Sequence, residues 1–343
     1  MHGLLAWLRR NWLLLLVLVA FAALVAGNRR ELTLFVATLR RGQGQWIAAA
    51  AGLQAVYFLL YSLLYQAAFL AVGIHSRALE ILPVLLASIF VNTVVPSGGL
   101  GGAALFVEDA GRHGQPGARA VEGVLLVTVA EGLAVLLILL VGLSDLLAHH
   151  VLLAYQLLGT AIYLLYVAAL TTILFLGRLR PAYLRSLLSW IEENANWLAG
   201  RFGRGPVLAP GWAQGNAQSF GRAAGAILQN RRLLVRTLLA ALALEAANLA
   251  SLYAAFRAFA QPIRLGALMA GYALGYVFSV VSFLPLDNGV MQGVMVLVYG
   301  SLGVATSVGL AVVFTWGGLN SWLPLLLGIF FLRQFAAVSS RHS

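Results

Sequence analysis

Long stretches of this chain contain no charged residue, and they constrain the fold more than any other feature. The segment from Trp46 to Gly73 is one of several that exceed the roughly 18 uncharged residues of a membrane-spanning helix. Only 10% of the residues are charged, whereas soluble globular chains contain about 25%. Because the stretches are long and do not alternate, they favour helices over a membrane barrel. We therefore predict an all-α polytopic integral membrane protein.

We expect about six full spans and two broken apolar stretches. The first broken stretch, 81–95, stops at Pro96, and the second, 266–284, stops at Pro285. Each piece is too short for a full crossing, which favours re-entrant hairpins. The sequence leaves open whether the last apolar segment is one span or two. The full spans are expected at Trp12–Gly27, Trp46–Gly73, Ala120–Leu143, Val151–Gly177, Leu233–Phe256 and Val304–Leu332.

The distribution of arginine orients the chain. All 22 basic residues are arginines, and nine of them lie in the range 178–236, which contains only two acidic residues. By the positive-inside rule this range is cytoplasmic, and so is the N-terminus. The chain is then a single transmembrane domain, 1–343, with pseudo-halves 1–200 and 217–343 joined by a Gly/Pro-rich cytoplasmic linker, 201–216. We expect a multi-pass protein of a bacterial or archaeal inner or plasma membrane.

Several function classes find no support in the sequence. The net charge of +11 is explained by arginines beside anionic lipid headgroups, and no nucleic-acid-binding pattern occurs. The chain has no cysteine, and it carries no zinc-peptidase, serine-hydrolase or phosphate-loop motif. His149 and His150 beside Asp145 lack the spacing of a formed metal site. We expect no catalytic residues, no metal, no cofactor and no nucleic-acid partner.

The two broken stretches are predicted to form an inverted pair. Three full spans separate them, so the first hairpin enters from the cytoplasm and the second from outside. A shift of 189 residues superposes Pro96 on Pro285 and Gly114 on Gly303. Inverted pairs of discontinuous helices form the midplane substrate sites of many transporters. The pattern therefore predicts an inverted-repeat transporter.

Two motifs carry a resemblance to a known family. The first broken stretch continues as VNTVVPSGGLGG, and the second contains FLPLDNGVMQG. The whole chain resembles the flippase-like, lysylphosphatidylglycerol synthase transmembrane-region family, whose members share a Pro-x-Gly-Gly-x-Gly motif. The resemblance implies a lipid-translocating membrane region without the family's fused aminoacyl-transferase domain. Asp287, Asn288 and Gln292 replace the paired glycines and glutamate of the second motif, and this departure concerns the substrate.

The glycine-rich turn of the first motif suits a phosphate group. Glycines allow a tight turn and a close approach of the backbone, and the half-helix that follows directs its free N–H groups at an anion. A serine can cap this helix or bind the ligand. The alternative is that the glycines only allow two helices to cross closely. The candidate phosphate-binding residues are Ser97, Gly98, Gly99, Gly101 and Gly102.

Two carboxylates, Glu131 and Glu245, lie near the middle of predicted spans with no arginine within four residues. Intramembrane carboxylates are costly, which makes them functional candidates. Together with Asp287 and Asn288 after the second break, they are predicted to bind a coupling proton or a cationic headgroup. The alternative is a hydrogen bond between helices, which Asn248, one turn from Glu245, could supply.

Two arginines are predicted to lie at the cytoplasmic mouth. Arg112 and Arg119 would attract anionic headgroups there. Each also has an acid within one helical turn, so we expect local ion pairs of Arg112 with Glu108 or Asp109 and of Arg119 with Glu122.

The favoured interpretation is a lipid flippase or scramblase. It would move a phosphate-bearing lipid, aminoacylated or polyprenyl-linked, between leaflets by alternating access. One alternative is a membrane-embedded transferase that acts on lipid-linked substrates, although no acid, base and nucleophile converge by spacing. Another is a structural or assembly partner. The expected partners are membrane lipids with an anionic or lipid-linked headgroup, and a homo-oligomer stays an open alternative.

Overall fold

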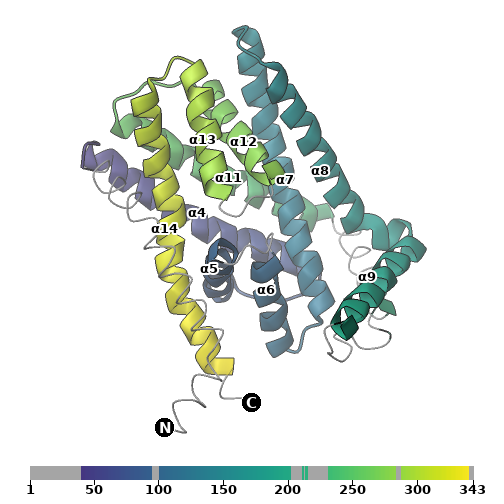
Figure 1. Cartoon of the computed structure of the whole chain (residues 1–343). Helices are drawn as coiled ribbons and strands as arrows, with labels where there is room; N and C mark the ends of the chain where they lie inside the picture. Colours follow the sequence, from purple (N-terminus) through teal and green to yellow (C-terminus); the bar gives the residue numbers. More distant parts are fainter. Residues whose placement is uncertain are drawn as a thin grey trace.

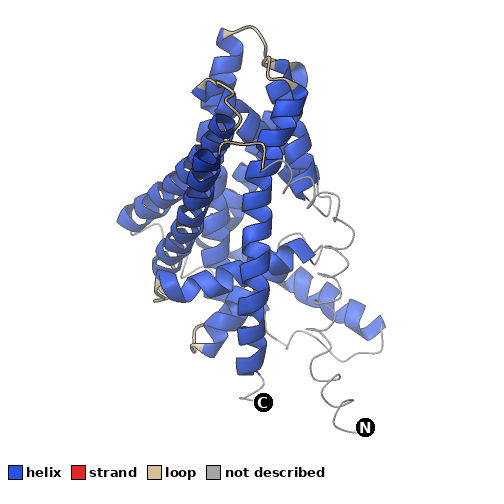
Figure 2. Ribbon diagram, turned by 90° about the vertical axis from the view of Figure 1, so that its left-hand side faces the viewer, coloured by secondary structure: helices blue, strands red, loops and turns tan. Residues whose placement is uncertain are grey.

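The computed structural model describes residues 40–94, 100–201, 211, 213–214, 231–282 and 287–339. Every regular element within these ranges is a helix (Figure 2), which confirms the predicted all-α class. The predicted first span, Trp12–Gly27, lies outside the described residues. The helices are α4 (Gly44–Ala71), α5 (Ala78–Val94), α6 (Leu100–Arg112), α7 (Gly117–Ala148), α8 (Ala154–Leu179), α9 (Pro181–Arg201), α11 (Arg231–Ala258), α12 (Leu265–Ser282), α13 (Asp287–Ser301) and α14 (Thr306–Ser339).

Four helices in the described part of the chain, α4, α7, α8 and α11, are long and apolar enough to cross a membrane. They coincide with four of the predicted spans. The last apolar segment forms the single helix α14, whose 34 residues continue through Pro324. A proline is tolerated in such a helix because neighbouring helices and local adjustments satisfy the backbone groups that it frees. The chain is therefore a multi-pass membrane protein, and its last apolar segment is one helix.

Both broken stretches form pairs of short helices. The first pair, α5 and α6, has 17 and 13 residues, and the second pair, α12 and α13, has 18 and 15 residues. All four fall short of the roughly 20 residues that cross a bilayer core. Figure 1 shows α5 and α6 in the lower half of the bundle and α12 and α13 in the upper half. The two hairpins therefore occupy opposite ends of the molecule.

In each hairpin, a glycine in the left-handed conformation lies two residues after the end of the second helix. The backbone angle φ is +68° at Gly114 and +88° at Gly303, a region that residues with a Cβ rarely adopt. In both cases the next N–H group bonds back to the helix, at 2.8 Å after Gly114 and at 3.0 Å after Gly303. The two glycines that the 189-residue shift superposes thus have the same structural role.

The long helices and the hairpins pack across the halves of the sequence. Helix α7 packs against α12 of the second hairpin, and α14 packs against α5 of the first. Glycines bring these pairs close together: a Cβ on Gly142 would lie 2.6 Å from the Cα of Ala270, and one on Gly328 would lie 2.8 Å from the Cβ of Phe90. Small residues allow such close approach of membrane helices. Each hairpin is therefore held by a long helix from the other half.

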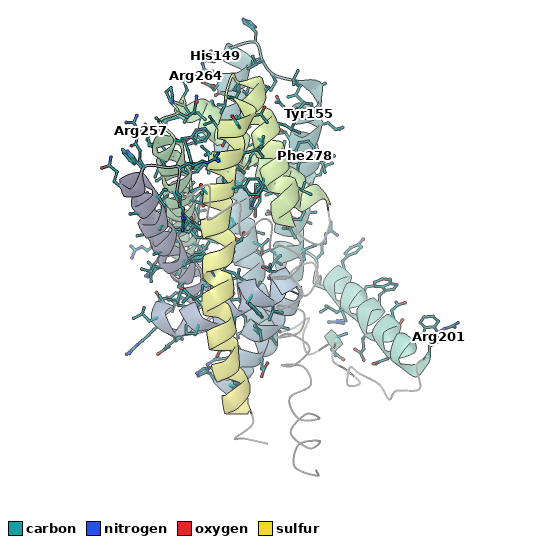
Figure 3. The ribbon with its side chains drawn as sticks, turned by 60° about the vertical axis from the view of Figure 1, so that its left-hand side comes forward. His149, Tyr155, Arg201, Arg257, Arg264 and Phe278 are labelled. Atoms are coloured by element: carbon teal, nitrogen blue, oxygen red, sulfur yellow. The ribbon has the colours of Figure 1, made fainter. Side chains whose placement is uncertain are left out.

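Helix α9 projects from the bundle (Figure 3) and packs mainly against α8. Its Tyr183, Trp190 and Trp197, spaced seven residues apart on one face, are 66%, 61% and 62% exposed. Exposed aromatics on one face are typical of a helix that lies in the membrane interface. The Glu192 carboxylate accepts hydrogen bonds from the N–H groups of Gly211 at 3.3 Å and Ala213 at 2.8 Å. This contact ties α9 to the few described residues of the predicted linker.

Candidate functional site

The two intramembrane carboxylates lie near each other between the halves. Glu131 is midway along α7, Glu245 is midway along α11, and the two groups are close enough to repel each other. Glu245 is buried, with 3% of its surface exposed, whereas Glu131 is partly exposed. Within the described residues, neither carboxylate forms an ion pair with an arginine. The structure thus brings together the pair that the sequence singled out.

A directed chain of hydrogen bonds ends on Glu245. The Trp316 indole N–H donates to the Asn248 side-chain oxygen at 3.1 Å, and the Asn248 amide donates to the Tyr272 hydroxyl at 3.0 Å. The Tyr272 hydroxyl in turn donates to the Glu245 carboxylate at 2.6 Å. Glu245 therefore has a hydrogen bond between helices, as the alternative from the sequence held, but Tyr272 of the second hairpin supplies it and not Asn248. The chain joins α11, α12 and α14 at one buried acceptor.

Tyrosines from three helices surround the carboxylate pair. The Tyr61 side chain of α4 lies close enough to Glu131 to interact with its carboxylate. Tyr57, Tyr163 and Tyr276, from α4, α8 and α12, each interact electrostatically with both carboxylates. Neighbouring rings are in contact, with centroids 5.7 Å apart for Tyr57 and Tyr61 and 6.2 Å apart for Tyr163 and Tyr276. The result is a carboxylate pair enclosed by hydroxyl groups and aromatic faces.

The site residues predicted from the sequence do not include these tyrosines. A signal was present, because Tyr57, Tyr61 and Tyr65 recur every four residues along one predicted span, and Tyr272 and Tyr276 repeat that spacing on another. This spacing places each set on a single helix face. Tyrosine carries a hydroxyl that needs a partner when it is buried. A tyrosine face inside an apolar span therefore indicates a polar site between helices.

The candidate phosphate site is described only in part. Ser97, Gly98 and Gly99 lie outside the described residues, and Gly101 and Gly102 lie in the first turn of α6. The N–H of Gly102 donates to the side-chain oxygen of Asn92 on α5 at 2.7 Å, so Asn92 caps this helix across the hairpin. A Cβ on Gly102 would collide with Asn92 and Ser88. Gly102 thus allows close packing of α5 and α6, and phosphate binding at this turn stays a prediction.

The second break carries the other predicted polar residues. Asp287 and Asn288 are the first two residues of α13, and their side chains lie outside what the structure describes. The start of a helix favours a negative charge, because its N–H groups and dipole are positive there. Their predicted role in headgroup or proton binding stays a prediction.

The two arginines of the predicted mouth have different surroundings. Arg112 pairs with Glu108 at 2.6 Å, as expected, while the Asp109 carboxylate lies 3.8 Å from His113. Arg119 and Glu122 form no ion pair in the described part of the chain. The Arg119 guanidinium instead reaches Gly73 in the loop between α4 and α5, 3.6 Å from where a Cβ would be.

Glu122 itself is fully buried, and neither of its carboxylate oxygens has a hydrogen-bond partner within the described residues. The ion pair predicted from the spacing of Arg119 and Glu122 therefore does not form, although Arg119 stays close enough to interact electrostatically with the carboxylate.

The predicted absence of a metal site concerned the loop after α7. No group of three or more His, Asp or Glu residues within the described ranges could hold a metal ion. His149 instead contacts Arg264 at the start of α12, and Arg264 also lies 3.6 Å from the Asp145 carboxylate. Asp145, His149 and Arg264 thus connect the end of α7 to the start of α12.

The central arrangement is suited to binding a cation. Two neighbouring carboxylates in a protein interior repel each other unless a proton or another positive group joins them. Tyrosine hydroxyls can hydrogen-bond an ammonium group, and tyrosine rings attract it through their faces. The site can therefore hold a proton or an amine between the two halves of the chain.

Comparison with known families matches residues 11–328 to the family described as lysylphosphatidylglycerol synthase TM region. No curated protein and no solved structure matches the chain. The matched range includes both hairpins and the two central carboxylates, and it extends over most of the sequence. The chain therefore belongs to the lysylphosphatidylglycerol synthase TM-region family.

Proposed function

We propose that this protein is a flippase or scramblase for a phosphate-bearing lipid. Membership of the family supports a function connected with membrane lipids. The observation that carries the proposal is the pair Glu131 and Glu245. These carboxylates lie on the packed helices α7 and α11, interact electrostatically, form no ion pair with an arginine in the described structure and have tyrosines around them. A site of this kind holds a positive group within the membrane.

The arrangement of helices supports an inverted repeat. In chain order, α4, α5, α6 and α7 have 28, 17, 13 and 32 residues, and α11, α12, α13 and α14 have 28, 18, 15 and 34. The packing of α7 on α12 is matched by the packing of α14 on α5. The hairpins lie at opposite ends of the bundle (Figure 1). Transporters with this architecture alternate between two open sides by moving one repeat against the other.

The proposed substrate has an anionic and a cationic part. The phosphate would bind the turn from Ser97 to Gly102, and Arg112 and Arg119 would attract anionic headgroups to the mouth. The amine of an aminoacylated headgroup, or a coupling proton, would bind Glu131 and Glu245, and Asp287 and Asn288 of the second hairpin would contribute to the same binding. A polyprenyl-linked phosphate has no amine, so it would bind only the phosphate turn. Glu131 and Glu245 would then hold a coupling proton.

The experiment measures movement of fluorescent lipids between leaflets of liposomes that contain the purified protein. We expect Glu131→Gln and Glu245→Gln to reduce the rate at least tenfold, because glutamine keeps most hydrogen bonds and removes only the charge. Glu193→Gln is the matched control, since Glu193 is exposed on α9 and outside the site. Wild-type rates in both site variants across the pH range would contradict the proposal. A chemically altered lipid would identify the protein as a transferase instead.

A further inference from the structure

Three residues connect α7 to the second hairpin at one end of the bundle. Arg264 precedes α12, and its guanidinium lies 3.6 Å from the carboxylate of Asp145 in the last turn of α7. The same guanidinium hydrogen-bonds the imidazole Nε2 of His149, which follows α7. Figure 3 shows His149 and Arg264 together at this end, where the arginine rule places the external side.

The protonation of His149 is set by its neighbours. Its Nδ1 lies 2.7 Å from the backbone oxygen of Asp145, which can only accept, so Nδ1 carries the proton. Nε2 then offers a lone pair to Arg264, which can only donate. The guanidinium therefore hydrogen-bonds the imidazole of His149 and forms an ion pair with the carboxylate of Asp145.

The packing beneath these residues brings the helices into direct contact. A Cβ on Gly266, in the first turn of α12, would collide with the Asp145 side chain. Asp145 therefore faces the start of α12, where the helix dipole also stabilises a negative charge. One turn further into the bundle, Gly142 meets the backbone of Ala270. The polar contact thus closes the outer edge of the α7–α12 interface.

The corresponding contact at the other end of the bundle is between the start of α5 and α14, and α14 has no acidic residue. Arg77 directly precedes α5, as Arg264 directly precedes α12, and α14 packs on α5 through Gly328. The sequence from residue 302 to the C-terminus contains no aspartate or glutamate, so α14 has no carboxylate to offer Arg77. The backbone N–H of Arg77 is instead bonded to Glu80 within its own hairpin. The two ends of the repeat are therefore chemically unequal.

We propose that Asp145, His149 and Arg264 form an ionic latch that closes one of the two gates of the transporter. The latch rests on the proposed alternating access between inverted halves. It holds the second hairpin against α7, so the central site opens toward this end only after Arg264 leaves both acceptors. Because the contact between α5 and α14 has no such latch among the residues that the structure describes, the protein rests with the latched end closed.

Cross-linking tests the latch directly, because the chain has no cysteine of its own. Asp145→Cys and Arg264→Cys are introduced together and bridged with a short bifunctional thiosulfonate reagent, which a reductant removes. We expect bridging to reduce lipid movement in liposomes at least tenfold and the reductant to restore it in the same sample. Each single cysteine variant, treated in the same way, is the control for loss of the ion pair and for the reagent. An unchanged rate in the bridged protein would overturn the proposal.

A second measurement does not depend on lipid transport. A cysteine at Gln261, in the loop before α12, is labelled with a membrane-impermeant maleimide. We expect Asp145→Asn to raise the labelling rate about two- to fivefold, the size expected for a partly exposed ion pair. The reversed pair Asp145→Arg with Arg264→Asp should bring the rate back, and Glu193→Gln should leave it unchanged.

The two measurements separate the two proposals. If the wild type moves no lipid, the proposed function fails, and the labelling rate still decides about the latch. An unchanged labelling rate in Asp145→Asn would overturn the latch even if lipid transport is confirmed.

Discussion

The hydrogen bond between Tyr272 and Glu245 allows a quantitative test of the central site. Tyr272→Phe keeps the ring, which packs edge-on against Trp316 with centroids 5.9 Å apart, and removes only the hydroxyl. The hydroxyl donates to a carboxylate at 2.6 Å and accepts from Asn248 at 3.0 Å. A hydrogen bond to a charged group contributes about 1.5–3 kcal/mol, and a buried amide left without its acceptor costs about 1 kcal/mol or more. We therefore expect the free energy of unfolding to fall by about 3 kcal/mol.

Tyr299→Phe is the matched control. Tyr299 is fully buried in the same hairpin, and its hydroxyl donates at 3.0 Å to the backbone oxygen of Leu268, which is neutral. Loss of a neutral hydrogen bond costs about 1 kcal/mol. Denaturant titration in mixed micelles, followed by circular dichroism, should therefore show a difference of about 2 kcal/mol between the two variants. Equal costs would refute the premise that Glu245 carries a negative charge when the Tyr272 hydroxyl bonds it.

A second comparison measures how much of the effect of Tyr272→Phe depends on the charge of Glu245. In a Glu245→Gln background the acceptor is neutral, so Tyr272→Phe should cost about 2 kcal/mol there, of which about 1 kcal/mol is the neutral bond and about 1 kcal/mol the Asn248 amide left without its acceptor. The difference between the costs of Tyr272→Phe in the wild-type and Glu245→Gln backgrounds measures the coupling between Tyr272 and Glu245. A cost that does not change with the background would show that the hydroxyl acts independently of the carboxylate.

Three further predictions concern topology, packing and the phosphate turn. A single cysteine at Arg112 should react with an impermeant maleimide only from the cytoplasm and one at Ser301 only from outside; reaction from the same side would remove the inverted repeat. Gly142→Val should destabilise the fold by about 1–3 kcal/mol through overpacking against α12, whereas Gly293→Val, with open space around it, should cost less in the same titration. Gly99→Val should stop lipid movement in liposomes while the melting temperature stays close to wild type, and unfolding of this variant would make Gly99 a packing residue.

Local features of the sequence determined the secondary structure and the candidate carboxylates. Uncharged runs of sufficient length form helices because a bilayer leaves no other way to satisfy the backbone. The breaks at Pro96 and Pro285 divide two such runs into pieces too short to cross. Glu131 and Glu245 could be singled out because the absence of an arginine within one turn can be read directly from the chain.

Only the tertiary structure decided which side chains meet. The spacing of Arg119 and Glu122 predicted an ion pair, yet the guanidinium lies beside Gly73 while the carboxylate is buried without a described partner. The Asp145–Arg264 pair and the electrostatic interactions of Tyr61 and Tyr276 with Glu131 join residues far apart in the sequence. Membrane helices are apolar on almost every face, so hydrophobic periodicity does not show which face meets protein. Close contacts at glycines, as at Gly142, fix how the helices cross, and that geometry decides which polar groups come together.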